Sequence, residues 1–150
     1  MYIIKPVPTN KVAFFGYRLV KKAKSNLRLT MIIADELSTT SPEYLKLLKR
    51  KIAQGLDIKR IGFGPKNQCL KAYKQLTVAR NNFAFKCNPD MKLVQRLLIV
   101  DEKEMLFAVY QSKSEKSVFY TQSKPIIKGF ANFFDDVFKR SEFINYNLVK

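Results

Sequence analysis

The first half of the chain alternates between helical and strand patterns of hydrophobic positions. Apolar residues at near-helical spacing predict a helix from Asn10, as its cap, to about Ser25, and a largely apolar strand follows at 27–34. Ser41, Pro42 and Glu43 are typical of a helix start, and Gly55 supplies a stop before a strand at 57–63. This alternation is typical of a parallel α/β sheet.

The second half contains closely spaced strands between two further helices. The hydrophobic pattern and the turn residues predict a short helix at 67–76, strands at 83–87, 93–100, 105–110 and 117–121, and a final helix at 124–141. One face of the final helix carries Ile126, Ile127, Phe130, Phe133, Phe134, Val137 and Phe138, and we expect this stripe to be core or a dimer seam. We therefore predict a single α/β domain over residues 1–150, with a mixed sheet flanked by helices.

The net charge of +16 is concentrated in two segments. Residues 1–34 hold seven Lys or Arg and no acid, and residues 64–100 hold seven Lys or Arg and only Asp90. Such a bias indicates an anionic small molecule or nucleic acid as partner, and the alternative is a solvated face. For nucleic acid, the candidate residues are Lys21, Lys22, Lys24, Arg28 and Lys86.

A second basic patch depends on how the later strands pair. If their strands were neighbours, four basic residues would lie together beside three aromatic ones. The basic residues are Lys86, Lys92, Arg96 and Arg80, and the aromatic residues are Tyr73, Phe83 and Phe85. Aromatic residues at strand spacing are more often part of a core, and that alternative stays open.

The absence of histidine restricts the chemistry. Serine or cysteine nucleophiles activated by histidine are excluded, and neither a metal site nor a cofactor is expected. Cys69 and Cys87 lack metal-ligand spacing, and we interpret them as reduced, partly buried thiols of a cytoplasmic protein. No apolar run is long enough for a membrane span, and neither a signal peptide nor a helix-turn-helix region is recognisable.

The segment 94–101, VQRLLIVD, has the spacing of H-x-K-x-x-x-x-D, the signature of the phospholipase D superfamily. Arg96 stands at the lysine position, Asp101 at the aspartate and Val94 at the nucleophilic histidine. The segment 108–111 falls where the family has Gly-Ser-x-Asn, and Phe130–Phe138 resembles its closing aromatic helix. Over roughly residues 10–140, the chain is most similar to the non-catalytic versions in archaeal sugar-sensing transcriptional regulators and related archaeal sensors.

The resemblance implies a phospholipase D-like fold without hydrolase activity, because active members need two histidines. It favours a non-enzymatic sensory or regulatory module that binds a small polar or anionic ligand, or a protein partner, in the vestigial groove. The candidate ligand-binding residues are Arg96, Asp101, Lys92 and Gln111, and a homodimer is expected. The alternative function is nucleic-acid binding. Arg96 could instead simply point outward from its strand, and Asp101 could simply form a turn by bonding nearby backbone amides.

Overall fold

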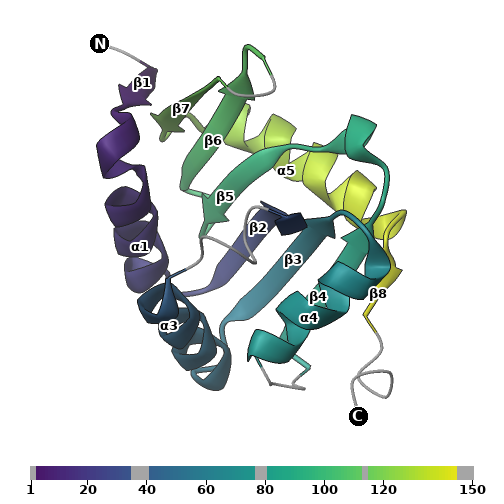
Figure 1. Cartoon of the computed structure of the whole chain (residues 1–150). Coiled ribbons are helices and arrows are strands. Elements are labelled where there is room, and N and C mark those ends of the chain that lie inside the picture. Colours follow the sequence, from purple (N-terminus) through teal and green to yellow (C-terminus); the bar gives the residue numbers. More distant parts are fainter. Residues whose placement is uncertain (1–2, 35–40, 77–80, 113–114, 145–150) are drawn as a thin grey trace.

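The computed structural model describes residues 3–34, 41–76, 81–112 and 115–144 (Figure 1). Within these ranges, eight strands form one mixed sheet in the order β1-β7-β6-β5-β2-β3-β4-β8. The strands are β1 (Ile4–Val7), β2 (Asn26–Ile32), β3 (Asp57–Phe63), β4 (Phe83–Asn88), β5 (Arg96–Val100), β6 (Glu104–Tyr110), β7 (Lys116–Thr121) and β8 (Glu142–Phe143). The helices are α1 (Val12–Lys22), α3 (Pro42–Ala53), α4 (Lys66–Leu76) and α5 (Lys124–Lys139).

The sheet has a parallel part and an antiparallel part. Strands β2, β3 and β4 pair in parallel, and α3 and α4 connect them. Strand β5 then joins the free side of β2 in the antiparallel direction, and β6, β7 and β1 extend the sheet beyond it. The predicted fold class, an α/β mixed sheet flanked by helices, is confirmed.

Helices cover both faces of the sheet and bury a separate apolar cluster on each. Helices α1, α3 and α4 lie on one face, and α5 crosses the other (Figure 1). Beneath α5 the buried residues are Ile61, Phe63, Leu97, Ile99, Met105, Phe107, Ile127, Ala131, Phe134 and Val137. The core interpretation of the aromatic helix is therefore confirmed for most of its stripe, while Phe133 stays 38% exposed.

The helix starts show where local sequence signals decide the structure. Ser41 caps α3 as predicted, because its hydroxyl accepts a hydrogen bond from the amide of Tyr44 at 3.2 Å. The predicted cap at Asn10 is wrong. The 3₁₀ turn η1 (Thr9–Lys11) contains that residue, and α1 begins only at Val12.

The end of α1 also differs from the prediction of a helix to about Ser25. Ala23 is extended, with φ −60° and ψ 135°, and the side chain of Lys51 binds its carbonyl oxygen at 2.9 Å. The helix therefore ends at Lys22, because contacts from elsewhere in the fold hold the residues that follow it.

Two further differences concern strands. Strand β5 begins at Arg96 instead of residue 93, because the side chain of Asp90 accepts from the amide of Lys92 at 3.0 Å and starts the 3₁₀ turn η2 (Met91–Leu93). The sequence also gave no signal for β1 and β8. These are short edge strands without an apolar alternation. No helix in the described ranges is long and apolar enough to cross a membrane.

Candidate functional site

A cavity of about 440 Å³ lies between the sheet and the helices α1 and α3. Its floor consists of two cross-strand rows. One row is Arg96, Ala108 and Val118, on β5, β6 and β7, and the next is Leu29, Leu98 and Leu106, on β2, β5 and β6. The walls are lined by Thr9, Val12, Ala13, Gly16, Tyr17, Ser41 and Tyr44. We call this cavity the α1–α3 pocket.

The pocket lies where two neighbouring strands stop pairing. The ladder between β2 and β5 ends at Leu29 and Leu98. Beyond it, the hydroxyl of Thr30 donates to the carbonyl oxygen of Gln95 and accepts from the amide of Leu97, the latter at 2.9 Å. The side chain of Thr30 thus takes over the role of the main-chain ladder at the edge of the pocket.

The lining of the pocket is mainly apolar, with charge at one end. Arg96 is half-buried on β5, and Lys116 lies on β7 with β6 between them, so their Cα atoms are roughly 12 Å apart. Tyr17 and Tyr44 contribute aromatic rings with hydroxyl groups, and no carboxylate of the described residues lines the pocket. An apolar cavity with a few convergent polar groups is typical of a small-molecule site.

Val94, at the position of the nucleophilic histidine, packs its side chain against the apolar core. It follows η2 with φ −63° and ψ 129°, and it packs against the cluster beneath α5. It does not line the α1–α3 pocket. A branched apolar side chain held in this way can neither attack a phosphorus atom nor transfer a proton.

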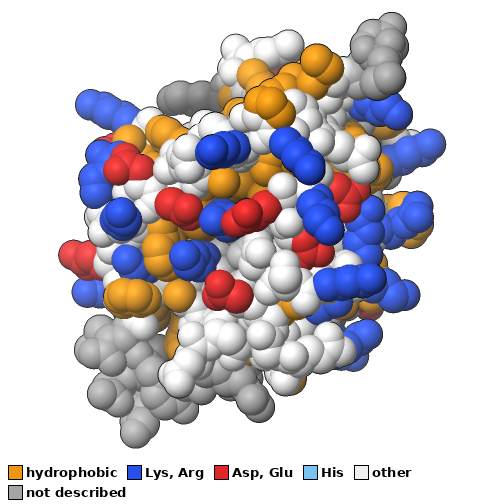
Figure 2. Space-filling model, turned by 180° about the vertical axis from the view of Figure 1, so that it is seen from behind, with side chains coloured by type: hydrophobic (Ala, Val, Ile, Leu, Met, Phe, Trp, Pro, Cys, Tyr) orange, Lys and Arg blue, Asp and Glu red, His pale blue; other side chains and the backbone are white. Residues whose placement is uncertain are grey.

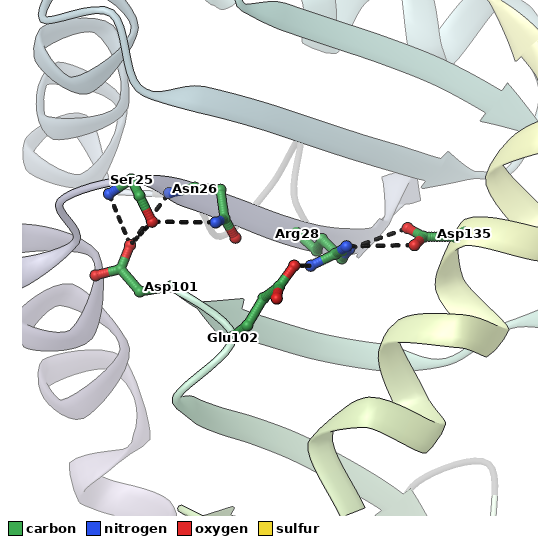
Figure 3. A network of polar contacts seen from close by, with 6 residues as sticks. All are labelled: Ser25, Asn26, Arg28, Asp101, Glu102 and Asp135. Atoms are coloured by element: carbon green, nitrogen blue, oxygen red, sulfur yellow. Dashed lines mark hydrogen bonds and ion pairs between the residues drawn. The ribbon is translucent and has the colours of Figure 1, made fainter. Parts of the chain in front are cut away.

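Asp101 lies at the opposite end of β5 from Arg96, about 17 Å along the strand. Its carboxylate accepts hydrogen bonds from the amides of Lys24 (3.0 Å), Ser25 (2.8 Å) and Asn26 (3.1 Å) and from the Ser25 hydroxyl (3.0 Å), as Figure 3 shows in part. Asp101 and Glu102 have φ values of 54° and 57° in the turn between β5 and β6. The turn interpretation of Asp101 is therefore confirmed, and its carboxylate is already occupied by the start of β2.

These contacts also change the acidity of Asp101. Desolvation acts to raise its pKa, but the hydrogen bonds from Ser25, Lys24 and Asn26 outweigh it. The pKa of the carboxyl group is therefore lowered from its ordinary value. Asp101 is consequently an anion that fastens the β5–β6 turn to the segment after α1.

The other two predicted ligand residues lie outside the pocket. Gln111 is exposed in the turn after β6, where its amide donates to the carbonyl oxygen of Glu115 at 2.9 Å. Lys92 is exposed in η2. Of the four predicted residues, the structure places only Arg96 in the α1–α3 pocket. Sequence reasoning missed Thr30, Tyr17, Tyr44 and Lys116, although a polar Thr30 within an apolar strand was a usable signal.

Comparison with known proteins reveals similarity in structure only. No family model and no curated protein matches the sequence. Among solved structures, TrmBL2, an archaeal chromatin protein with a novel mode of DNA binding, superposes with a TM-score of 0.75 at 13% identity, over 95% of this chain and 54% of its own. Nuc from Salmonella typhimurium, a phospholipase D family member, superposes with a TM-score of 0.68 at 14% identity, over 95% and 96% of the two chains.

The chain has a phospholipase D-like fold. NucT from Helicobacter pylori gives the same TM-score of 0.68 at 11% identity, over 94% and 97% of the two chains. The chain therefore spans about half the length of TrmBL2 and nearly the whole length of Nuc and NucT. The resemblance inferred from the spacing of segment 94–101 is confirmed as a likeness of fold.

The predicted nucleic-acid residues separate into two groups on this phospholipase D-like fold. Lys21, Lys22 and Lys24 are exposed at the end of α1. Arg28 is instead on the opposite face, where its side chain is 14% exposed and binds Asp135 at 3.0 Å and Glu102 at 3.1 Å (Figure 3). Figure 2 shows this rear face, on which acidic and basic side chains lie interspersed.

Lys86 is also unavailable to a partner. It is 8% exposed, and its ammonium group lies 4.3 Å and 4.4 Å from the ring centroids of Phe138 and Phe143. It also donates to the carbonyl oxygen of Phe138 at 2.9 Å. Desolvation, assisted by the charge of Lys59, lowers its pKa. Lys86 therefore fastens the end of α5 to β4.

The predicted second basic patch is wrong. Lys86 is on β4, which β3 and β2 separate from the strand of Arg96, and Arg80 lies outside the described residues. Tyr73, Phe83 and Phe85 are buried and contact one another with centroid distances of 6.0–6.3 Å. The alternative that these aromatic residues belong to the core is confirmed.

Both cysteines are free thiols, and both are buried, whereas the sequence predicted partial burial. The thiol of Cys87 donates to the carbonyl oxygen of Gly64, with 3.4 Å between sulfur and oxygen. A hydrogen bond with Cys87, together with burial, raises the pKa of Cys69 far above its ordinary value. Cys69 therefore stays protonated and is a poor nucleophile.

Proposed function

We propose that this chain is a non-catalytic regulatory module that binds a small polar or anionic ligand in the α1–α3 pocket. The observation that supports this most directly is the position of Arg96. It stands where the phospholipase D signature has its phosphate-binding lysine, and it lines the pocket floor. A binding role is thus retained at this position while the nucleophile position holds Val94.

The proposed absence of catalysis follows from the chemistry of the available groups. The sequence has no histidine, so neither the nucleophile nor the general acid of this superfamily is present. Cys69 and Cys87 are both buried and do not line the pocket, and Asp101 is committed to backbone amides. Binding without turnover is the function that the remaining groups of the pocket support.

The lining of the pocket indicates how a ligand would lie. The inner row of Leu29, Leu98 and Leu106 offers only apolar surface, whereas Arg96 and Lys116 are cationic. An anionic or polar group would therefore bind at the Arg96 end, and the remainder of the ligand would lie toward the leucines. Arginine favours this arrangement because its guanidinium group donates two parallel hydrogen bonds to a carboxylate or phosphate.

The test is a thermal-shift screen with inorganic phosphate, sugar phosphates, free sugars and short carboxylic acids. Ala108→Phe would fill the pocket floor, and Val109→Phe is its matched control, because Val109 is the adjacent residue of β6 and is 47% exposed. We expect a stabilising compound to shift the wild type and Val109→Phe but not Ala108→Phe. A second variant, Arg96→Met, should lose the shift for anionic compounds only. Equal shifts in all four proteins, or no shift in the wild type, would contradict the proposal.

Catalytic inertness is tested separately with bis(p-nitrophenyl) phosphate, in the presence and absence of EDTA. We expect no release of p-nitrophenol above the buffer rate. Arg96→Met serves as the diagnostic variant, because Asp101 variants would also lower the stability of the fold. Turnover by the wild type that Arg96→Met abolishes would show that the chain is an enzyme.

The second candidate function is nucleic-acid binding by the first basic block. The observation that favours it is the clustering of exposed cations along α1, namely Arg18, Lys21 and Lys22, with the exposed Lys11 directly before the helix. A structurally similar protein, TrmBL2, is described as a DNA-binding chromatin protein. The wild-type chain should bind a labelled oligonucleotide at low salt, and absence of binding would remove this candidate.

A further inference from the structure

The exposed face of α1 carries cations and one aromatic ring in a single stripe. Lys11 lies directly before α1. Phe14, Arg18 and Lys21 follow it at steps of three, four and three residues, so these last three share one side of the helix. All four are exposed, and Phe14 retains 65% of its accessible surface. The stripe is about 15 Å long at 1.5 Å per residue.

A groove runs beside this stripe, and Tyr17 borders both this groove and the α1–α3 pocket. It has a volume of about 660 Å³ and lies between α1 and the strands β6 and β7. Phe15 and Tyr120 form part of its wall, with ring centroids 5.0 Å apart in an edge-to-face arrangement. Arg18, Lys21 and Lys22 also line it, and we call it the α1 groove.

Only one carboxylate among the described residues lines the α1 groove, and it is already neutralised. Glu104 binds the ammonium group of Lys22 at 2.7 Å and accepts a hydrogen bond from the hydroxyl of Tyr120. Its side chain is 12% exposed. Lys11, Arg18 and Lys21 form no ion pair within the described part of the chain. The groove thus presents an excess of positive charge to solvent.

This arrangement is unfavourable for an isolated helix. Arg18 lies three and four residues before Lys21 and Lys22, and like charges at this spacing destabilise a helix. Residues 1–34 contain no acid that could offset them. Phe14 also leaves a large apolar ring in water, with the guanidinium carbon of Arg18 5.7 Å from its centroid. A polyanion that carries aromatic groups would compensate both features at once.

We propose that the α1 groove binds single-stranded nucleic acid. The phosphates contact Arg18 and Lys21, and an unpaired base stacks on Phe14 beside the Arg18 guanidinium. Cations that follow the backbone and an aromatic platform for a base are the two elements of sequence-tolerant single-strand recognition. The stripe accommodates about four nucleotides at a rise of 3.4 Å each. This assignment rests on the second candidate function and is independent of the ligand pocket.

Two other anionic surfaces fit the groove less well. A basic helix that binds a lipid surface needs a continuous exposed apolar face. In α1 that face is turned to the core, with Leu19 and Val20 at 3% and 0% exposure, which leaves Phe14 alone. Duplex DNA keeps its bases stacked in pairs and so offers no free base face to Phe14. Lipid and duplex are therefore competing outcomes of the experiment.

The experiment measures fluorescence anisotropy of a labelled oligothymidylate with the full chain, over a series of salt concentrations. Arg18→Glu/Lys21→Glu removes the groove charge, and Lys128→Glu/Lys139→Glu is the matched control on the exposed side of α5. We expect the groove variant to bind at least about tenfold more weakly than the control, and the salt slope to fall by roughly 0.7 for each lost phosphate contact. Phe14→Ala should weaken binding about fivefold or more. Inorganic polyphosphate, which lacks bases, should bind Phe14→Ala and the wild type equally.

Each result of the anisotropy experiment supports or removes a particular assignment. No binding by the wild type removes the groove assignment and the second candidate function together. Binding that both double variants weaken equally leaves nucleic-acid binding in place but removes the groove. Insensitivity to Phe14→Ala, a preference for duplex, or tighter binding to anionic vesicles overturns the single-strand assignment. Phe14 is exposed, so its variant should unfold at the wild-type temperature, which a melting curve checks.

Discussion

Replacing Asp101 tests whether one carboxylate fastens the β5–β6 turn to the start of β2. Asp101→Ala removes the acceptor of three backbone amides and one hydroxyl. Asp101→Asn keeps an oxygen acceptor and tolerates the positive φ of 54°, so it removes mainly the charge. Asp136→Asn is the matched control, because Asp136 forms an exposed ion pair with Arg140 at 2.7 Å within one helix.

The expected magnitudes follow from the number and exposure of the bonds. A hydrogen bond to a charged group contributes about 1.5–3 kcal/mol. Lys24 and Ser25 are exposed, so water replaces part of what is lost, and the contributions are not additive. We expect Asp101→Ala to lower the free energy of unfolding by about 2–4 kcal/mol and Asp101→Asn by about 1–2 kcal/mol. The control should change it by less than about 0.5 kcal/mol.

The dependence of the free energy of unfolding on pH separates the effect of the Asp101 charge from the effect of its side-chain shape. The pKa of Asp101 is lowered in the folded chain, so the folded state binds fewer protons at this site than the unfolded state. Its stabilising contribution is present above the ordinary value of 3.8 and is lost as the pH falls through the lower folded pKa. Urea unfolding followed by circular dichroism, at neutral pH and in steps from about pH 5 to about pH 2.5, measures this.

Two results would contradict a stabilising role for the Asp101 carboxylate. If the wild type and Asp101→Asn differ by the same free energy down to the lowest pH at which both fold, the charge is not the stabilising element. If Asp101→Ala costs no more than Asp136→Asn, the amide contacts contribute nothing net. In either case Asp101 would be only a turn residue.

Two further substitutions and the oligomeric state of the wild type have expected outcomes. Gly62→Ala should lower the free energy of unfolding in urea by about 1–3 kcal/mol. The new Cβ would lie 2.7 Å from Ile33 Cδ1 and 3.1 Å from Phe85 Cε1, which is too close. An unchanged unfolding midpoint would contradict this prediction. Asp135→Asn should cost about 1–3 kcal/mol, because the largely buried Arg28 loses its bidentate partner, and Asp136→Asn again serves as control. We also expect a homodimer by light scattering at physiological salt, formed through the exposed side of α5 around Phe133; a monomer at high concentration would remove this prediction.

The sequence predicted those parts of the fold that local signals specify. The Ser41-Pro42-Glu43 start and the amphipathic stripe of α5 depend on residues near each other in the chain, and both are confirmed. The end of α1 depends instead on Asp101 and Lys51, which are distant in sequence. Strand β1 is defined by its pairing with β7 and not by its own pattern.

The candidate site was predictable only in part for the same reason. The spacing of segment 94–101 identified Arg96, but Arg96 and Asp101 lie at opposite ends of β5. Two residues of one motif therefore lie in different places, because Arg96 lines the pocket and Asp101 belongs to the β5–β6 turn. Three separate elements, α1, α3 and β7, bring Tyr17, Tyr44 and Lys116 to the pocket. The hydrophobic periodicity within one element carries no information about which residues of the other elements lie nearby. Arg28 and Lys86 were indistinguishable by charge from Lys21, and only tertiary partners separate them.

The pairing of β1 with β7 affects the timing of folding during synthesis. Ile4 lies opposite Thr121, so strand β1 has no partner until β7 has been translated, more than a hundred residues later. At about 5–20 residues per second, this delay is roughly 6–25 s. Strand β2 likewise waits for β5 on one side, although β3 reaches its other side earlier. The parallel part of the sheet can therefore assemble before β7 has been translated, and the antiparallel part is completed only after β7 has been translated.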